Sequence, residues 1–125
     1  MFEIRVEAEF AAAHFLRDYH GKCENLHGHN YKVYAHARGA NLNEGGMLVD
    51  FGILKGTLRK VLEKLDHSNL NDLVEEGKFI FDQNPSAERI AQYIFEKIKQ
   101  ELPAAPLYAV DVFETSTSRA RYIAD

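Results

Sequence analysis

A thiol and two imidazoles lie within seven residues of this chain, at Cys23, His27 and His29. The run after His29 alternates between apolar and polar residues, which predicts a strand, and side chains two apart on a strand point to the same face. His27 and His29 are therefore expected to converge. A catalytic zinc usually has three protein ligands and one open position. The pattern predicts a metal site whose third ligand comes from elsewhere, and His14 is the natural candidate.

Two other interpretations of these residues stay open. An isolated His-x-His pair can be two surface histidines, because imidazole is common at protein surfaces. Alternatively, Cys23 could join the three histidines in a closed structural zinc site, although structural zinc usually has more thiolates. In an open site Cys23 would instead be a nucleophile or base, a role typical of a lone cysteine near histidines in an intracellular protein.

Asp66 and His67 form a second candidate pair, at the end of a predicted helix. Asp66 could orient the imidazole so that His67 deprotonates a thiol, as in other base-activated nucleophiles. The simpler interpretation is a histidine at a helix C-terminus, where it interacts with the helix dipole.

Glu114 is a candidate because of its position in a predicted strand. It occupies the same alternate positions of the strand as Tyr108, Val110 and Val112, which are the apolar ones. Its carboxylate should therefore point inward. A buried charge needs a partner, and a bound ligand would supply one. The alternative is a carboxylate at the strand end that points to solvent.

Composition limits the class of protein. With 125 residues, 46% hydrophobic and 27% charged, the chain is expected to form one domain over residues 1–125. The net charge of -4 argues against non-specific binding of nucleic acid. No apolar run is long enough to span a membrane, and the N-terminus lacks the apolar core of a signal peptide. One cysteine excludes a disulfide within the chain, and we expect a cytoplasmic protein.

The periodicity predicts an α+β fold with the order ββααββ. Strands are expected over residues 2–13, 29–38, 107–115 and 119–123, and helices after Asp50 and after Ser86. The stretch from Asn69 to Asn84 is expected to be a breaker and a loop. We expect an antiparallel four-stranded sheet with two helices on one face.

Six blocks of residues, which together cover nearly the whole chain, resemble the 6-pyruvoyltetrahydropterin synthase / 6-carboxytetrahydropterin synthase family. The blocks are His14, Cys23-x-x-x-His27-Gly-His29-Asn-Tyr31, Leu48–Lys55, Leu65–Asn71, Asn84–Glu88 and Glu114-Thr115. The resemblance implies the tunnelling fold, in which subunits join their sheets into a barrel, usually as two stacked trimers. It therefore implies a homohexamer with active sites at subunit interfaces, in which open strand edges become paired.

The spacing within the cysteine block resembles one branch of that family. The pyruvoyl branch typically has five residues between the cysteine and His-Gly-His, whereas the carboxy branch has three, as here between Cys23 and His27. Members of the carboxy branch convert 7,8-dihydroneopterin triphosphate to 6-carboxy-5,6,7,8-tetrahydropterin and release acetaldehyde and triphosphate, in the route to queuosine and other deazapurines. The alternatives are the pyruvoyl synthase reaction, which eliminates triphosphate, and a non-catalytic, zinc-stabilised module that recognises a pterin or purine.

The resemblance also implies a role for each candidate residue in a zinc-dependent carbon–carbon lyase. His14, His27 and His29 would hold one zinc ion per chain. Cys23, as a thiolate, would move protons at the side-chain carbons of the substrate, and Asp66 and His67 would set its protonation. Glu114, a catalytic candidate as well, would bind the pterin ring together with Thr115. The ring would act as the electron sink, so no organic cofactor is expected.

Overall fold

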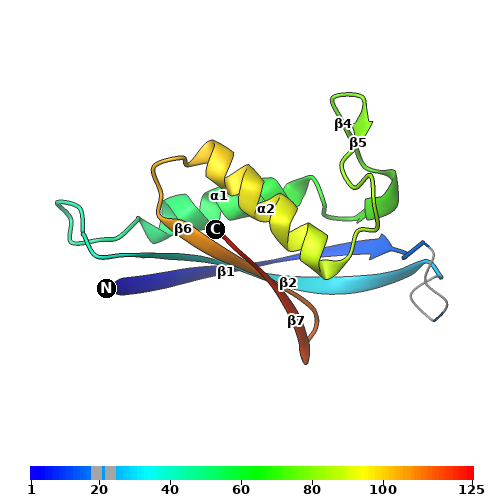
Figure 1. Cartoon of the computed structure of the whole chain (residues 1–125), viewed down its shortest axis with the longest axis horizontal. Coiled ribbons are helices and arrows are strands. Elements are labelled where there is room, and N and C mark those ends of the chain that lie inside the picture. Colours follow the sequence, from blue (N-terminus) through cyan, green and yellow to red (C-terminus); the bar gives the residue numbers. More distant parts are fainter. Residues whose placement is uncertain (18–20, 22–24) are drawn as a thin grey trace.

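The computed structural model describes residues 1–17, 21 and 25–125, and it has two layers, a sheet and a pair of helices on one of its faces (Figure 1). In chain order the elements are β1 (Phe2–His14), β2 (His27–Gly39), α1 (Phe51–Glu63), β3 (Ser68–Asn69), a 3₁₀ helix (Leu70–Asp72), β4 (Val74–Glu75), β5 (Lys78–Phe79), α2 (Ala87–Glu101), β6 (Leu107–Thr115) and β7 (Ser118–Ile123). The α+β prediction and the four long strands are confirmed.

The main sheet has five strands in the order β3-β1-β2-β6-β7, and it is mixed. The prediction of a four-stranded, purely antiparallel sheet was therefore wrong. The missing strand is β3, which runs parallel to β1 and pairs Ser68 with Ala12 and Asn69 with Ala13. Two residues are too short a run for hydrophobic alternation to reveal, and here pairing with an existing edge decides the conformation.

The pairing of the first two strands determines where the histidines lie. β1 is antiparallel to β2 along its whole length, from Phe2 opposite Gly39 to His14 opposite His27. On β1 the side chains of Val6, Phe10 and His14 are buried on the inner face, whereas the intervening glutamates Glu7 and Glu9 are exposed. The alternation read from the sequence is thus confirmed, and it carries His14 to the inner face at the strand end.

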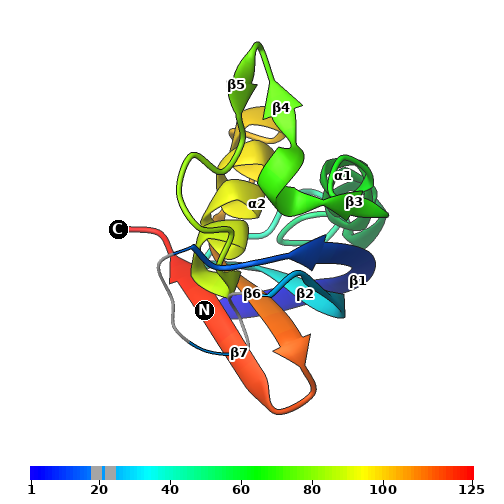
Figure 2. The same cartoon turned by 90° about the vertical axis from the view of Figure 1, so that its right-hand side faces the viewer.

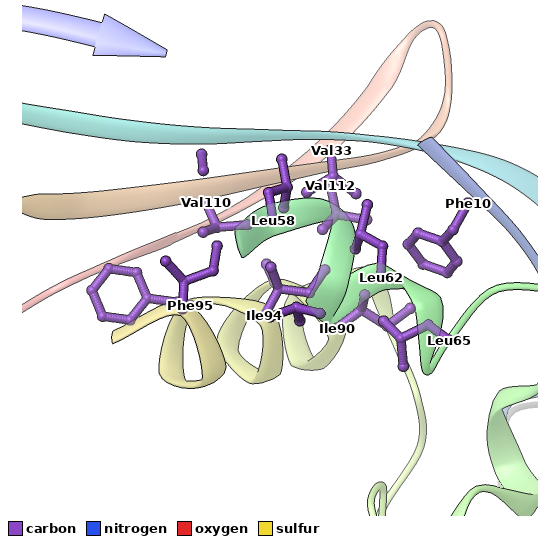
Figure 3. Close-up of a cluster of buried hydrophobic side chains, with 14 of the residues drawn as sticks. Phe10, Val33, Leu58, Leu62, Leu65, Ile90, Ile94, Phe95, Val110 and Val112 are labelled. Carbon is purple, nitrogen blue, oxygen red and sulfur yellow. The ribbon is translucent and has the colours of Figure 1, made fainter. Parts of the chain in front are cut away.

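Each helix begins at a residue whose side chain caps its first turn, and each buries one stripe of apolar residues. Asp50 accepts a hydrogen bond from the backbone N–H of Ile53 at 3.1 Å, and Ser86 accepts one from that of Arg89 at 3.3 Å. Figure 3 shows how the buried side chains of the helices meet those of the sheet. The labelled core residues are Phe10, Val33, Leu58, Leu62, Leu65, Ile90, Ile94, Phe95, Val110 and Val112. Within the described residues no helix is long and apolar enough to cross a membrane.

The stretch between the helices is more ordered than the predicted loop. β4 and β5 form a short antiparallel hairpin that stands beyond the helices, away from the sheet (Figure 2). Its turn residues Glu76 and Gly77 both have positive φ, 53° and 77°, which is the geometry of a two-residue hairpin turn. Lys97 on α2 pairs with Glu75, the residue of β4 next to the turn, and so ties the hairpin to the helix.

Candidate metal centre

Three imidazoles meet at the end of the sheet where β1 stops and β2 begins. The register places His14 opposite His27, and the two-residue period places His29 on the same face. One candidate ligand atom from each of these three residues lies within 4.8 Å of the other two. The ring centroids are 4.6 Å apart for His14 and His27, 5.3 Å for His14 and His29, and 4.8 Å for His27 and His29. The structure thus brings together all three predicted ligands.

Backbone carbonyls orient two of the three rings. Nδ1 of His14 donates to the carbonyl oxygen of Pro85 at 2.8 Å, and Nδ1 of His27 donates to that of Asn25 at 2.6 Å. A carbonyl oxygen can only accept, so each Nδ1 carries the proton and each Nε2 is left with a free lone pair. Histidines that bind metals are usually held in this way by a hydrogen bond from the other ring nitrogen.

The free nitrogens fit a cation. Nε2 of His14 and Nε2 of His29 are buried and have no hydrogen-bond partner among the described residues. Burial lowers the pKa of His14, which favours the neutral imidazole that can bind a metal. An unpaired buried polar group costs about 1–3 kcal/mol, and a coordinated ion would remove that cost. Three imidazoles that leave one side open are the donor set of a catalytic zinc.

Glu114 lies at the open side of these imidazoles. Its carboxylate oxygens are 3.5 Å from Nε2 of His14 and 3.9 Å from Nε2 of His29, and its side chain is 28% exposed. The parity argument from the sequence therefore agrees with the orientation seen here. Next to Glu114 is a cavity of about 260 Å³, which has room for a flat ring. Its lining residues are Leu16, Ser86, Ala87, Glu88, Glu114, Ser118, Arg119 and Ala120.

Asp66 and His67 form a pair at the edge of the sheet. Nδ1 of His67 donates to Oδ2 of Asp66 at 2.8 Å, and Oδ1 of Asp66 accepts from the backbone N–H of Ala11 on β1 at 2.9 Å. Both hydrogen bonds lower the pKa of Asp66, and the bond from Ala11 has the larger effect. His67 has a φ of 55°, a strained conformation for a residue other than glycine. The contact with Asp66 thus orients the imidazole of His67.

The pair is not joined to the three imidazoles within one chain. The side chain of His67 is 84% exposed, and no hydrogen bond or ion pair links it to His14, His27 or His29 in the described part of the chain. His67 and His29 do line one cavity of about 380 Å³ at this edge of the sheet.

Thr115 is not brought to the cluster within the described chain. Thr115 follows Glu114 on β6 and so points to the opposite face of the sheet, where it lines a separate cavity of about 290 Å³ with Lys32, Tyr34 and other residues. Cys23 lies outside the described residues.

A buried ion pair on the helix-free face was not predicted. Asp111 is 3% exposed, and its carboxylate accepts hydrogen bonds from Nε2 of His36 at 2.8 Å and from Nε of Arg121 at 2.6 Å. Burial alone would raise the pKa of Asp111, but the bonds from Arg121 and His36 lower it below its usual value. Alternation marks this face as polar, whereas only the pairing of β2, β6 and β7 shows that these charges meet.

Tyr31 is the other unexpected polar group, because its ring belongs to the core. It is fully buried and stacked on Phe10, with ring centroids 4.6 Å apart and an interplanar angle of 10°. Its hydroxyl is buried and has no hydrogen-bond partner among the described residues. Burial and the nearby charge of Glu114 raise the pKa of this hydroxyl above its usual range. Tyr31 belongs to the alternating run after His29, and that pattern assigns no role to its hydroxyl.

Comparison with known proteins gives a consistent result. The family model described as 6-pyruvoyl tetrahydropterin synthase matches residues 3–125. A protein of Synechocystis sp. named 6-carboxy-5,6,7,8-tetrahydropterin synthase is 38% identical, over 98% of this chain and 93% of its own length. A protein of the same name from Haemophilus influenzae is 32% identical, over 98% of this chain and 99% of its own length.

Proteins with the pyruvoyl name are also similar. The human 6-pyruvoyl tetrahydrobiopterin synthase is 33% identical over 82% of this chain and 70% of its own length. The solved structure of 6-pyruvoyl tetrahydropterin synthase from Caenorhabditis elegans superposes with a TM-score of 0.87 at 31% identity, over 99% of this chain and 96% of that chain. The likeness extends through β1, β2 and β6, the strands that carry the histidines and Glu114.

Proposed function

Because this chain belongs to the 6-pyruvoyl tetrahydropterin synthase family, we propose that it converts 7,8-dihydroneopterin triphosphate, with uptake of water, to 6-carboxy-5,6,7,8-tetrahydropterin, acetaldehyde and triphosphate. One observation carries the proposal, which is the convergence of three oriented imidazoles with Glu114 at their open side. Homologues named as pterin synthases support the substrate class. The carboxy product would then enter the route to queuosine and other deazapurines. We propose that the reaction takes place in the cytoplasm.

The histidines and Glu114 would divide the binding of the substrate. His14, His27 and His29 would hold one zinc ion, which as a Lewis acid makes nearby substrate hydroxyls more acidic. Glu114 would accept hydrogen bonds from the amide and amino groups of the pterin ring, which would lie in the adjacent cavity. Paired hydrogen bonds to a carboxylate are strong and directional, so they fix the direction in which the substrate side chain points.

Proton transfer would fall to Cys23, Asp66 and His67. Cys23 as a thiolate would remove and return protons at the side-chain carbons of the substrate. The imidazole of His67, held by the hydrogen bond from Nδ1 to Asp66, would set the protonation of that thiol. The Asp66–His67 pair is exposed at the sheet edge, so we assign it to the site of a neighbouring subunit.

This assignment requires an oligomer, and we propose a homohexamer whose sites lie at subunit interfaces. The edge of β7 and most of the edge of β1 have no partner strand in the described chain, and pairing between subunits would protect them. Light scattering at micromolar concentration should give the mass of six chains. A monomeric mass with activity intact would contradict both the assembly and the shared site.

Subunit mixing tests the shared site more sharply. His67→Ala and His29→Ala should each be inactive, because each removes a group that every site needs. If the two groups come from different chains, unfolding and refolding an equal mixture should restore about a quarter of the wild-type activity, since random assembly pairs two intact contributions at about one interface in four. Mixed variants that remain inactive, although each assembles normally, would place both groups in one chain.

Product analysis tests the reaction itself. The zinc-loaded protein should be incubated with 7,8-dihydroneopterin triphosphate and the products identified by mass spectrometry. The three-residue spacing between Cys23 and His27 favours the carboxy product together with acetaldehyde. The pyruvoyl compound as main product, without acetaldehyde, would instead support the second candidate, which the similarity to the human and nematode proteins keeps in view. Binding of a pterin without turnover would indicate the non-catalytic module.

A further inference from the structure

The buried hydroxyl of Tyr31 makes no hydrogen bond with any group in the described part of the chain. Three buried side-chain polar atoms in the described residues have no hydrogen-bond partner, and they are Nε2 of His14, Nε2 of His29 and the hydroxyl of Tyr31. The two nitrogens are accounted for by a metal. The hydroxyl is not, and leaving it unpaired in the interior costs free energy that phenylalanine at this position would avoid.

The ring of Tyr31 leans toward the histidines. Tyr31 lies opposite Phe10 and His27 lies opposite His14, so His14 is four residues further along the strands than Tyr31. Four residues of strand extend about 13 Å. The ring centroids of His14 and Tyr31 are nevertheless only 5.9 Å apart, and that of His29 is 5.4 Å from Tyr31. The two side chains therefore lean toward each other along the strands, and the ring of Tyr31 borders the histidine cluster.

Tyr31 is also the neighbour of Glu114 across the sheet. β2 and β6 pair Lys32 with Phe113, and the next residues in that register are Tyr31 and Glu114. Both side chains are on the face that carries the imidazoles. Tyr31 thus borders both the metal ligands and the carboxylate assigned to the pterin ring, the two groups that a bound pterin would join.

We propose that the hydroxyl of Tyr31 binds substrate, by donating a hydrogen bond to an oxygen atom on the side chain of the bound pterin. Glu114 contacts the imidazoles and also lines the cavity assigned to the ring. Because the hydroxyl of Tyr31 is buried, the proposal requires that this carboxylate turn toward the cavity when a pterin binds and so give a substrate oxygen access to the hydroxyl. The stacked ring of Phe10 holds the phenol in place, so little ordering is needed on binding. This assignment rests on the proposed function and deepens it.

Two pterins that differ only in the side chain test the assignment. Neopterin carries side-chain hydroxyls and 6-methylpterin has none. Their dissociation constants should be measured by fluorescence titration of the zinc-loaded protein, for the wild type, for Tyr31→Phe and for a control, Tyr122→Phe. Tyr122 is a half-buried tyrosine of β7 that packs on Phe95, away from the cluster.

Tyr31→Phe should weaken neopterin binding by about 5- to 30-fold and leave 6-methylpterin binding unchanged within about twofold, as expected for one lost hydrogen bond. Tyr122→Phe should change neither. Equal weakening of both pterins would overturn the assignment, because it would place Tyr31 against the ring or Glu114. Unchanged binding of both would also overturn it. A wild type that binds neither pterin would overturn the pterin function itself.

Thermal unfolding supplies a readout that does not depend on ligand or turnover. Removing an unpaired buried hydroxyl should raise Tm of the ligand-free Tyr31→Phe protein by about 2–6 °C and leave its zinc content at that of the wild type. A hydroxyl kept for function is expected to lower stability in this way. A lower Tm for Tyr31→Phe would show that the hydroxyl has a structural partner, and it would contradict the assignment.

Discussion

The substitution Glu114→Gln tests the proposed ring contact with little change in shape. The carboxylate is largely withdrawn from water, with 28% of the side chain exposed, so hydrogen bonds to it are only partly weakened by solvent. A glutamine oxygen can still accept one bond, but its NH₂ group faces a second donor of the ring. A hydrogen bond to a charged group contributes about 1.5–3 kcal/mol, so we expect a loss of about 2–3 kcal/mol in binding, a factor of about 30–150 in Kd.

Isothermal titration calorimetry with a pterin and metal analysis of the same samples provide the measurement. Glu114→Gln should bind the pterin more weakly and retain one zinc per chain, because the three imidazoles remain. Glu9→Gln is the matched control, since Glu9 is 63% exposed on the opposite face of the sheet. An unaltered Kd for Glu114→Gln would refute the assignment of this carboxylate to the ring, and loss of zinc would show that Glu114 is a metal ligand.

Two further predictions concern stability. Asp111→Asn should destabilise the protein at neutral pH by about 2 kcal/mol, less than a fully buried ion pair would cost, because the side chain of Arg121 is 27% exposed. The pKa of Asp111 is lowered on folding, so its contribution is complete above about pH 4 and is lost as the pH falls through the folded-state pKa. Urea denaturation at several pH values should therefore show a steeper acid loss of stability for wild type than for Asp111→Asn, and parallel curves would contradict this. Leu58→Ala, at a fully buried position, should cost about 2–5 kcal/mol in the same assay without changing zinc content, and a cost below about 1 kcal/mol would show that the core closes around the gap.

Much of the fold could be predicted because long elements carry many repeats of their own period. Strand alternation gave β1, β2 and β6 to within two residues, and helical spacing, with the predicted cap at Ser86, gave both helices. β3 and the β4–β5 hairpin were missed because each of these strands has two residues, too few to show an alternating pattern. Their conformation comes from pairing with a neighbour that the sequence does not display.

The candidate site could likewise be predicted only in part. Parity placed His14, His27, His29 and Glu114 on one face, and the structure brings them together because they lie on adjacent strands. The position of the Asp66–His67 pair depends on how β3 joins the edge of β1, which local pattern cannot show. The buried pair of His36 and Asp111 likewise depends on the register between β2 and β6.

The central claim is an open metal site of three imidazoles with a thiol that acts on the substrate instead of binding the metal. Zinc per chain, measured by atomic emission on wild type, Cys23→Ala and His27→Ala together with turnover, tests it most directly. The account predicts one zinc per chain, unchanged Tm and no turnover for Cys23→Ala, and loss of both zinc and turnover for His27→Ala. Zinc lost from Cys23→Ala as readily as from His27→Ala, with a lower Tm, would contradict it, because structural metal binding is coupled to folding and the thiol would then be a fourth ligand.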